Sequence, residues 1–238
     1  MAQKLKYYNN DLVRYEIYKL VDWYDPILRQ PTIPFTWNED SKFLKAQYIG
    51  FSLAETLNTM EGLGLSANQV GLRDRVCAVN MGDKIWIMFN PEIISKLEQP
   101  AEYAEGCLSY PGLYLKLNRP KHIKVRFQAI GGQFVEQEFD GLTAVCVQHE
   151  IDHLDGKVFT DQVSSIKLEQ AKRKIKSNLK KMRVYNKQAA AMKAAEEIID
   201  LNSIKSEKPK IQILEDIPKL NLNPPAPPKM PDKFIYKV

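Results

Sequence analysis

The chain has 238 residues, 44% of them hydrophobic and 26% charged, and its formal net charge is +5. This length and composition support one packed domain with an appendage, while no apolar stretch reaches the ~20 residues that a membrane span needs. The three cysteines cannot all pair, and the first residues lack the apolar core of a secretory signal, so we expect a cytoplasmic protein without a membrane partner, in the host cytoplasm if a bacteriophage carries the gene.

The predicted elements begin with a helix and continue with strands. Residues 41–60 contain no proline and place apolar side chains at helical spacing. Short runs of β type follow at residues 75–80, 84–90, 93–97, 121–129 and 134–139. The pair Gly131-Gly132 predicts a hairpin between the last two runs, and the spacing becomes helical again after Gly141. This order predicts an α+β fold in which a mainly antiparallel sheet packs around a central helix.

The C-terminal third differs in composition from the rest. Residues 166–193 hold ten Lys or Arg and one acid, a balance of +9, so the remainder sums to −4. Residues 157–208 have neither Gly nor Pro, which predicts long helices, whereas the last thirty residues hold seven of the fourteen prolines. We therefore predict a catalytic domain at 1–165, a basic helical extension at 166–202 and a proline-rich extended or disordered tail at 203–238.

The most specific signal is the sequence QHEIDH at residues 148–153. On a helix, His149 and His153 are one turn apart and share a face, so both imidazoles can bind one metal ion. Glu150 stands between them in sequence and can act as general base on a metal-bound water. The alternative is that chance placed this pattern on a surface helix.

A catalytic site of the zinc type also needs a third protein ligand and an open position for water. No histidine follows His153, although acids such as Asp155 and Glu169 do. Upstream, Cys107 lies in EGCLSYPG at 105–112, where a glycine and a turn flank it. A thiolate lowers the net charge of a divalent centre while keeping it Lewis-acidic, so Cys107 is the candidate third ligand.

A third sequence, GLGLSANQ at residues 62–69, is weaker evidence when taken alone. Two glycines at this spacing are more typical of a tight turn, and the missing third glycine and lysine argue against a nucleotide-binding loop. Small residues nevertheless let a backbone approach a ligand closely, and Gln69 can donate an amide N–H to a developing oxyanion.

The three sequences together resemble the peptide deformylase family. Its pattern has G-apolar-G-apolar-small-Ala-x-Gln, Glu-Gly-Cys-apolar-Ser and Gln-His-Glu-x-Asp-His motifs, which stand here at 62–69, 105–109 and 148–153. Ser66 replaces the common alanine, a change of one small residue for another. The resemblance spans approximately residues 20–165 and says less about the basic segment and the tail.

The resemblance implies a metal-dependent hydrolase that removes the N-formyl group from the initiator methionine of nascent peptides. The metal ligands would be Cys107, His149 and His153. Fe²⁺ is the expected native ion, and Zn²⁺, Ni²⁺ or Co²⁺ can occupy the same site. Metal-bound hydroxide would attack the formyl carbon, with Glu150 as general base and then acid, while the Gln69 side chain and the Leu108 N–H meet the oxyanion.

The resemblance also implies how the peptide binds. It would run as an extended strand beside Leu63, Gly64 and Gly106. The methionine side chain would enter an apolar pocket formed by Leu142, Val145, Cys146 and His149, with Tyr103 at one edge. Plain helix core is the open alternative for Leu142 and Val145. Asp152 and Arg119 match positions that support the metal-binding helix through an ion pair.

The resemblance also implies that a C-terminal helix can dock on the ribosome, and the basic segment 166–193 suits contact with phosphate backbone. A solvated helical face is the equal alternative. Two other functions remain open. One is another metal-dependent peptidase or amidase, against which Cys107 and Gln69 argue. The other is a ribosome-binding adaptor that has lost activity, against which the intact motif residues argue.

Overall fold

The computed structural model describes residues 4–8, 11–37, 41–82, 84–96, 99–177 and 180. The chain divides into two units, residues 1–171 with 233–238 and residues 172–232. The described part of the second unit is helical, at 172–177 and 180. The predicted tail 203–238 and most of the extension 166–202 lie outside the described residues, so their predicted boundaries stay predictions.

Two strands precede the first helix, and seven strands lie between that helix and the second. The N-terminal part contains the strands β1 (Lys4–Tyr8) and β2 (Asp11–Tyr15), the 3₁₀ turn η1 (Pro26–Arg29) and the helix α1 (Ser41–Thr59). The middle contains β3 (Gly64–Ser66), η2 (Ala67–Val70), β4 (Val76–Asn80), β5 (Ile85–Lys96), β6 (Pro100–Cys107) and β7 (Tyr110–Pro120). Then come β8 (His122–Gln128), β9 (Phe134–Asp140), α2 (Gly141–Leu154), η3 (Phe159–Gln162) and helical residues 165–177.

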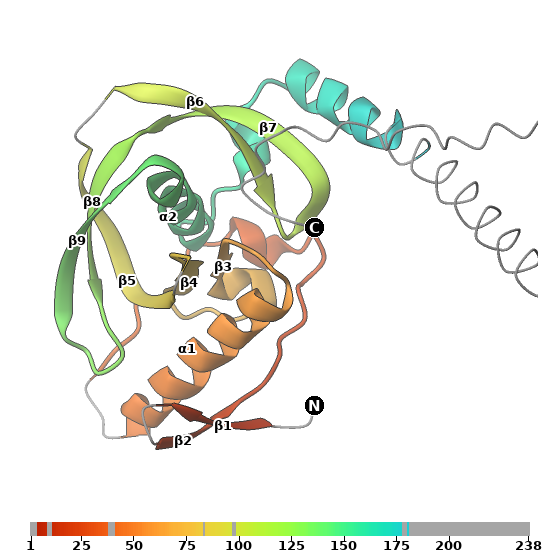
Figure 1. Ribbon diagram of the computed structural model, residues 1–238. Coiled ribbons are helices and arrows are strands. Elements are labelled where there is room, and N and C mark those ends of the chain that lie inside the picture. The colour runs from red at the N-terminus through yellow and green to blue at the C-terminus, as the bar shows by residue number, and fades with distance from the viewer. Residues whose placement is uncertain are drawn as a thin grey trace, which may run out of the picture. The chain divides into compact units, whose positions relative to one another are not determined.

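Among the described strands, five form an antiparallel sheet in the order β3-β4-β5-β8-β9, and β6 pairs with β7 in a separate ribbon. Figure 1 shows α2 between this ribbon and the sheet, with α1 on the other side of the sheet. Side chains along β4 alternate accordingly, because Cys77 and Val79 join the core under α2 while Val76 and Ala78 join the core under α1. The predicted α+β fold around a central helix is confirmed.

The strands β1, β2 and β3 were not predicted, and two further corrections concern the middle of the chain. The runs predicted at 84–90 and 93–97 belong to one strand, β5, which continues through Pro91 with register shifts between Phe89 and Glu92 and between Ile93 and Ser95. Asn90 lies at the first irregularity with a φ of 50°, and its side chain bonds the backbone N and O of Phe35. The ribbon β6–β7 was not predicted, because prolines and glycines interrupt its sequence.

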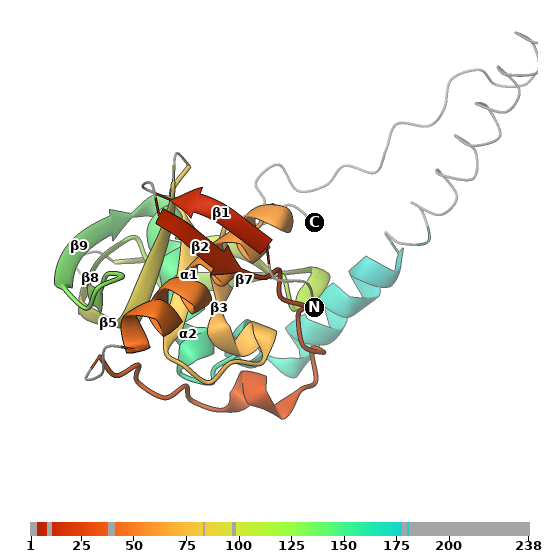
Figure 2. The same ribbon diagram turned by 90° about the horizontal axis from the view of Figure 1, so that it is seen from below.

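The N-terminal segment lies along α1, as Figure 2 shows for the β1–β2 hairpin. Two buried hydroxyls of the helix hold the chain that follows the hairpin. Ser52 Oγ accepts from the N–H of Glu16 at 3.0 Å, and Thr56 Oγ1 accepts from the N–H of Tyr18 at 2.9 Å. These bonds satisfy backbone donors that would otherwise be buried without partners.

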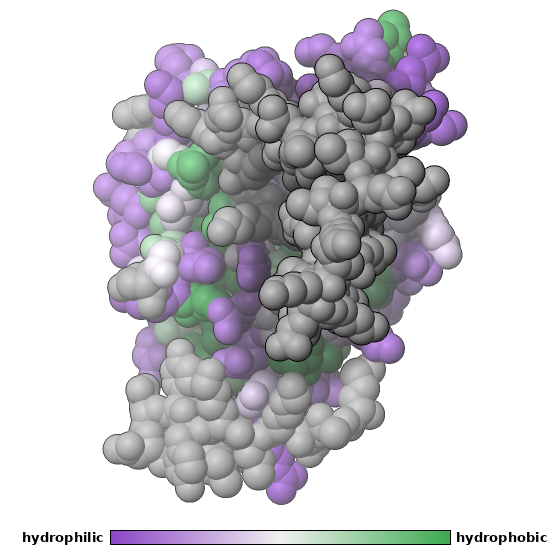
Figure 3. Space-filling view, turned by 45° about the vertical axis from the view of Figure 1, so that its right-hand side comes forward, coloured by the Kyte–Doolittle hydropathy of each residue, from purple (hydrophilic) through white to green (hydrophobic). Residues whose placement is uncertain are grey.

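On the face that Figure 3 shows, hydrophilic side chains cover much of the described surface, with apolar side chains in small patches. Within the described ranges, no helix is both long and apolar enough to cross a membrane.

Candidate metal centre

The helix α2 carries the two histidines into the interior. It begins at Gly141, whose φ of 53° favours glycine, and nearly all of its residues from Ala144 to Leu154 are buried. His149 and His153 are 2% and 1% exposed, and their ring centroids lie 4.9 Å apart. One helical turn thus places both imidazoles on the same buried face.

Cys107 reaches these rings from the end of β6. The chain turns sharply there, because Cys107 pairs with Tyr110 across the β6–β7 turn. Its Sγ lies 3.2 Å from Nε2 of His153, and one ligand atom from each of Cys107, His149 and His153 lies within 4.8 Å of the others. A tetrahedral ion with metal–S near 2.3 Å and metal–N near 2.0 Å separates its ligand atoms by about 3.5 Å. The three side chains therefore fit a small divalent cation.

The two histidines have opposite electrostatic surroundings. Burial by itself would lower the pKa of His149, but hydrogen bonds with Cys107 and Glu105 and nearby acidic charges raise it to about 10. Burial, together with the charges of His149 and Arg119, holds the pKa of His153 well below its usual range. A neutral imidazole is the form of histidine that binds metals.

A buried carboxylate behind His149 was not among the predicted site residues. Glu105 is fully buried, and its Oε2 lies 2.9 Å from Nδ1 of His149, which leaves Nε2 as the nitrogen able to bind a metal. Burial would raise the pKa of Glu105, but its hydrogen bonds with His149 and Arg119 hold that pKa below its ordinary value. Its place in the same short motif as Cys107, EGC at 105–107, was the available signal.

Arg119 joins this carboxylate to the helix. Its Nε and Nη2 donate to Glu105 at 2.7 and 2.9 Å, and its Nη1 donates to Asp152. Arg119 as a whole is 5% exposed. The structure thus places Arg119 and Asp152 together, as the resemblance implied. It adds Glu105, to which Arg119 donates two hydrogen bonds and not one.

Gln69 points its amide toward the same centre from η2. Its Oε1 accepts from the N–H and the hydroxyl of Ser66, both at 2.9 Å. Its Nε2 donates to Ser109 Oγ at 3.1 Å and lies 3.5 Å from Cys107 Sγ. Ser66 and Ser109 fix the orientation of the amide so that its N–H groups face the candidate metal ligands.

Glu150 lies against β3. The side chain is 1% exposed, and a methyl group at Gly64 would collide with its carboxylate and come within 2.8 Å of Cys146 Sγ. Glycine is therefore required at this position for the carboxylate to lie where it does.

Of the residues predicted to contact the methionine side chain, Val145 and Tyr103 lie together. Val145 is fully buried, and Leu63, Tyr103 and Leu108 pack against it. Cys146 is 2% exposed and lies in the core under α2. Leu142 is 48% exposed and is not among the described side chains that pack on Val145.

Two glycines border this apolar group. A methyl at Gly62 would lie 2.9 Å from Leu108 Cδ1, so the absence of a side chain there lets Leu108 pack closely. A methyl at Gly106 would lie 2.7 Å from Tyr114 Cε1, so the aromatic ring covers the backbone of Gly106. Both close approaches depend on glycine.

Comparison with known proteins matches this arrangement. A sequence profile described as polypeptide deformylase matches residues 17–169. A peptide deformylase of Alkalilimnicola ehrlichii is 38% identical over 164 residues, covering 67% of this chain and 89% of that protein. One of Saccharophagus degradans is 42% identical over 124 residues, covering 51% of this chain and 72% of that protein.

Solved structures that resemble this chain are also peptide deformylases. The crystal structure of a peptide deformylase from Legionella pneumophila has a TM-score of 0.61 and 32% identity, covering 71% of this chain and 98% of that one. One from Synechococcus elongatus, in complex with actinonin, has a TM-score of 0.60 and 31% identity, covering 66% of this chain and 85% of that one. With its motifs converging on one buried cluster and the family profile matching residues 17–169, the chain belongs to the peptide deformylase family, metal-dependent enzymes that remove the formyl group from nascent peptides.

Proposed function

We propose that this chain deformylates N-formylmethionyl nascent peptides with one divalent metal held by Cys107, His149 and His153. The observation that carries the proposal is that the ligand atoms of these three buried residues lie within 4.8 Å of one another. The helix α2, which carries both histidines, also carries the buried Glu150. Fe²⁺ is the proposed native ion, with Zn²⁺, Ni²⁺ or Co²⁺ as alternatives. When bound, the metal supplies a Lewis acid that lowers the pKa of water and polarises the formyl carbonyl.

Glu150 is the proposed general base and acid. Its buried carboxylate interacts electrostatically with His149, and its close approach to Gly64 brings it to the strand along which we place the peptide. In this position it takes the proton of the attacking water and delivers it to the leaving amine of methionine.

Two donors are proposed for the oxyanion that develops on the formyl oxygen. Gln69 brings an amide whose orientation two serines fix, and the Leu108 N–H follows the ligand Cys107 directly. Donors fixed in advance need no reorganisation as charge develops, which is why they stabilise the transition state more than the substrate.

The peptide is proposed to add as a strand between two sheet edges. Within the described residues β3 is the terminal strand of the five-stranded sheet, and β6 has β7 as its one strand partner. Backbone groups at Leu63, Gly64 and Gly106 then pair with the peptide. The methionine side chain contacts the apolar group of Leu63, Tyr103, Leu108 and Val145, with Cys146 beside it and Leu142 at the exposed rim.

Glu105, Arg119 and Asp152 are proposed to position the metal-binding helix. Glu105 fixes the ring of His149, and Arg119 connects that carboxylate to Asp152 near His153. Such contacts orient metal ligands without touching the substrate.

The basic segment 166–193 is proposed to bring the enzyme to the ribosome in the cytoplasm. Its described lysines and Arg173 are exposed on the helical residues 165–177 and at 180, as contact with phosphates requires. Deletion of residues 166–238 is expected to reduce co-sedimentation with ribosomes at low salt while formate release from a short peptide persists. Unchanged co-sedimentation would leave a solvated helical face as the correct interpretation.

The function is tested by anaerobic purification, metal analysis and formate release from a formyl-methionyl peptide. Exclusion of oxygen is needed because a thiolate at a ferrous centre oxidises readily. We expect about one metal ion per chain and formate as the product, with no cleavage of the same peptide lacking the formyl group. Cleavage of a peptide bond instead would identify a metallopeptidase, and metal-loaded protein without turnover would identify an adaptor.

A further inference from the structure

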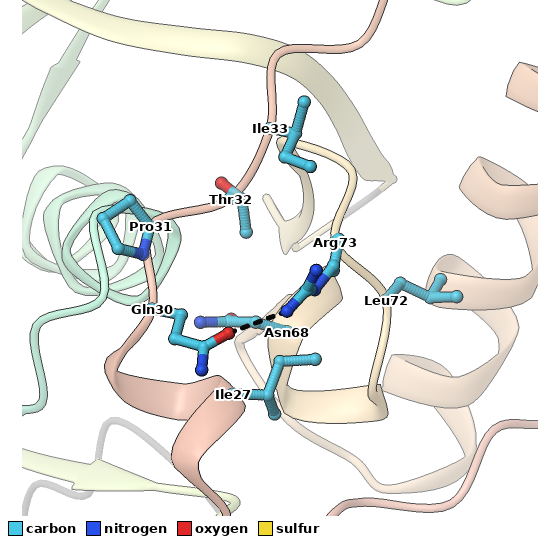
Figure 4. A pocket seen from close by; sticks show the side chains of 8 residues that line it. All are labelled: Ile27, Gln30, Pro31, Thr32, Ile33, Asn68, Leu72 and Arg73. Atoms are coloured by element: carbon cyan, nitrogen blue, oxygen red, sulfur yellow. Dashed lines mark hydrogen bonds between the residues drawn. The ribbon is translucent and has the colours of Figure 1, made fainter.

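The cavity between residues 27–33 and residues 68–73 does not lie on the proposed path of the peptide (Figure 4). None of the proposed metal ligands or substrate contacts lines it. The residues that follow the methionine are therefore expected elsewhere, at the ribbon β6–β7, where the proposed peptide pairs with Gly106.

The inner face of the ribbon β6–β7 is directed toward α2. There Tyr103 packs against Val145, and Oε2 of Glu105 lies 2.9 Å from Nδ1 of His149. The proposed pocket for methionine lies on this face, because Val145 is part of it. Successive side chains of an extended peptide point to opposite faces, so the residue after methionine points to the outer face of the ribbon.

Tyr114 occupies the outer face at Gly106. Its neighbours on β7, Leu113 and Leu115, are buried, whereas Tyr114 itself is half-buried, as the alternation of a strand requires. A Cβ atom added to Gly106 would lie 2.7 Å from Cε1 and 3.4 Å from Cζ of the tyrosine. The aromatic ring thus fills the place that a side chain of residue 106 would take on β6.

A peptide strand beside Gly106 would meet this ring. Among the described strands β6 pairs with β7 on one edge, and its other edge is the one along which the peptide is proposed to add. Directly opposite residues on neighbouring strands have Cβ atoms about 4.5–5.5 Å apart. Because the ring of Tyr114 stands where the Cβ of residue 106 would be, it becomes the cross-strand neighbour of the outward-pointing peptide residue.

The surroundings of the ring favour an apolar side chain in this contact. Burial raises the pKa of Tyr114, in agreement with a ring that is partly withdrawn from water. Farther along the same ribbon, Lys116 and Glu102 pair with each other at 2.6 Å, so their charges offset one another. We propose, as a step that rests on the function proposed above, that Tyr114 selects the second residue of the nascent peptide, with aromatic side chains preferred over aliphatic ones and both over glycine.

The test compares formate release from three peptides that differ in the residue after formylmethionine, which is phenylalanine, leucine or glycine. The full-length, metal-loaded protein is used, and kcat and KM are measured for each peptide. We expect kcat/KM to be about three- to tenfold higher for the phenylalanine peptide than for the glycine peptide, with leucine between them. The gain should lie in KM, since the contact exists in the substrate complex as well as in the transition state.

Variants of the tyrosine separate the ring from the rest of the site. Tyr114→Ala is expected to make kcat/KM equal for the three peptides, whereas Tyr114→Phe keeps the order of the parent. Tyr114→Leu retains an aliphatic side chain over Gly106, so it should prefer leucine over glycine and lose the advantage of phenylalanine. The matched control Phe134→Ala removes an exposed ring from β9 and should keep the order of the parent.

The ratio between peptides distinguishes selection from a structural role of the ring. If Tyr114 only covered the backbone of Gly106, Tyr114→Ala would lower kcat/KM by the same factor for all three peptides, and this result would overturn the proposal. Equal values of kcat/KM in the parent protein would overturn it as well. Absence of formate from every peptide would instead refute the proposed function, so the two failures are distinguishable.

Discussion

The two helices on opposite faces of the sheet differ in what they bury. Under α1 the core is made of aliphatic and aromatic side chains such as Leu53 and Phe89. The buried hydroxyls of Ser52 and Thr56 on this helix accept hydrogen bonds from backbone N–H groups of the N-terminal segment. Under α2 the apolar core continues into a cluster of Gln148, His149, Glu150 and His153, to which Cys107 and Glu105 are added from β6.

The difference separates stability from chemistry. Burial of apolar surface stabilises a fold wherever it occurs, whereas buried ionisable groups are costly unless they are paired or bind a metal. Substitutions in the cluster under α2 should therefore change turnover or metal affinity while the protein stays folded. Substitutions in the core under α1 should lower the free energy of unfolding and leave turnover unchanged.

The largest expected effect on turnover is that of Glu150→Gln. Removal of a general base is expected to lower kcat about 10²–10⁴-fold, while metal content and melting temperature stay as in the parent. Formate release with equal metal loading is the measurement, and Glu138→Gln, on exposed β9, is the matched control. A variant that kept more than a tenth of the parent rate would contradict the assignment of Glu150.

Gln69→Ala should have the next largest effect. Loss of one oxyanion donor is expected to raise the barrier by about 3–4 kcal/mol, which is roughly 10²–10³ in kcat, with the metal retained. Full activity in this variant would remove Gln69 from the mechanism.

Gly64→Ala tests whether the Glu150 carboxylate must lie against β3. The added methyl would collide with that carboxylate and with Cys146 Sγ, so kcat is expected to fall about 10²-fold through displacement of the base. Steady-state kinetics at full metal loading measure this, and a change in KM alone would show that only the path of the peptide was disturbed.

Glu105→Gln should act on the metal and not on the substrate. Weaker support of His149 is expected to lower metal affinity about 10–100-fold, as measured by competition with a chelator. Glu102→Gln is the matched control, since it lies on the same strand in an exposed ion pair with Lys116. Equal affinities in the two variants would mean that the buried carboxylate does not position the ligand.

Leu53→Ala should have the smallest effect on turnover. The side chain is fully buried under α1, so its truncation is expected to lower the free energy of unfolding by about 2–5 kcal/mol. Denaturant titration measures this loss, and kcat per folded, metal-loaded molecule should equal that of the parent. A comparable fall in kcat would show that the core under α1 also controls the chemistry.

The sequence predicted the parts of the fold that depend on local pattern. The helices at 41–60 and after Gly141 and the strands at 75–80, 121–129 and 134–139 agree with α1, α2, β4, β8 and β9 to within one or two residues. It failed where tertiary contacts override local signals. Pro91 suggested a break, yet β5 continues through it, and the alternation of Leu113, Leu115 and Leu117 in β7 was obscured by the prolines and glycine around it.

The site was predictable to the extent that chemistry restricts residue type. Cys107, His149 and His153 were predicted as metal ligands, and the structure brings their ligand atoms together. Glu105 was missed because a carboxylate that supports a histidine can come from any strand that passes behind it. The place of the Tyr114 ring over Gly106 was equally invisible in sequence, since it is a property of packing.

The central claim is that one thiolate and two imidazoles bind the same metal ion. X-ray absorption at the metal edge of the anaerobically loaded protein measures this directly. We predict one sulfur at about 2.3 Å and two nitrogens at about 2.0–2.1 Å, with the sulfur signal lost in Cys107→Ala. A shell of nitrogen and oxygen alone in the parent protein would contradict the account.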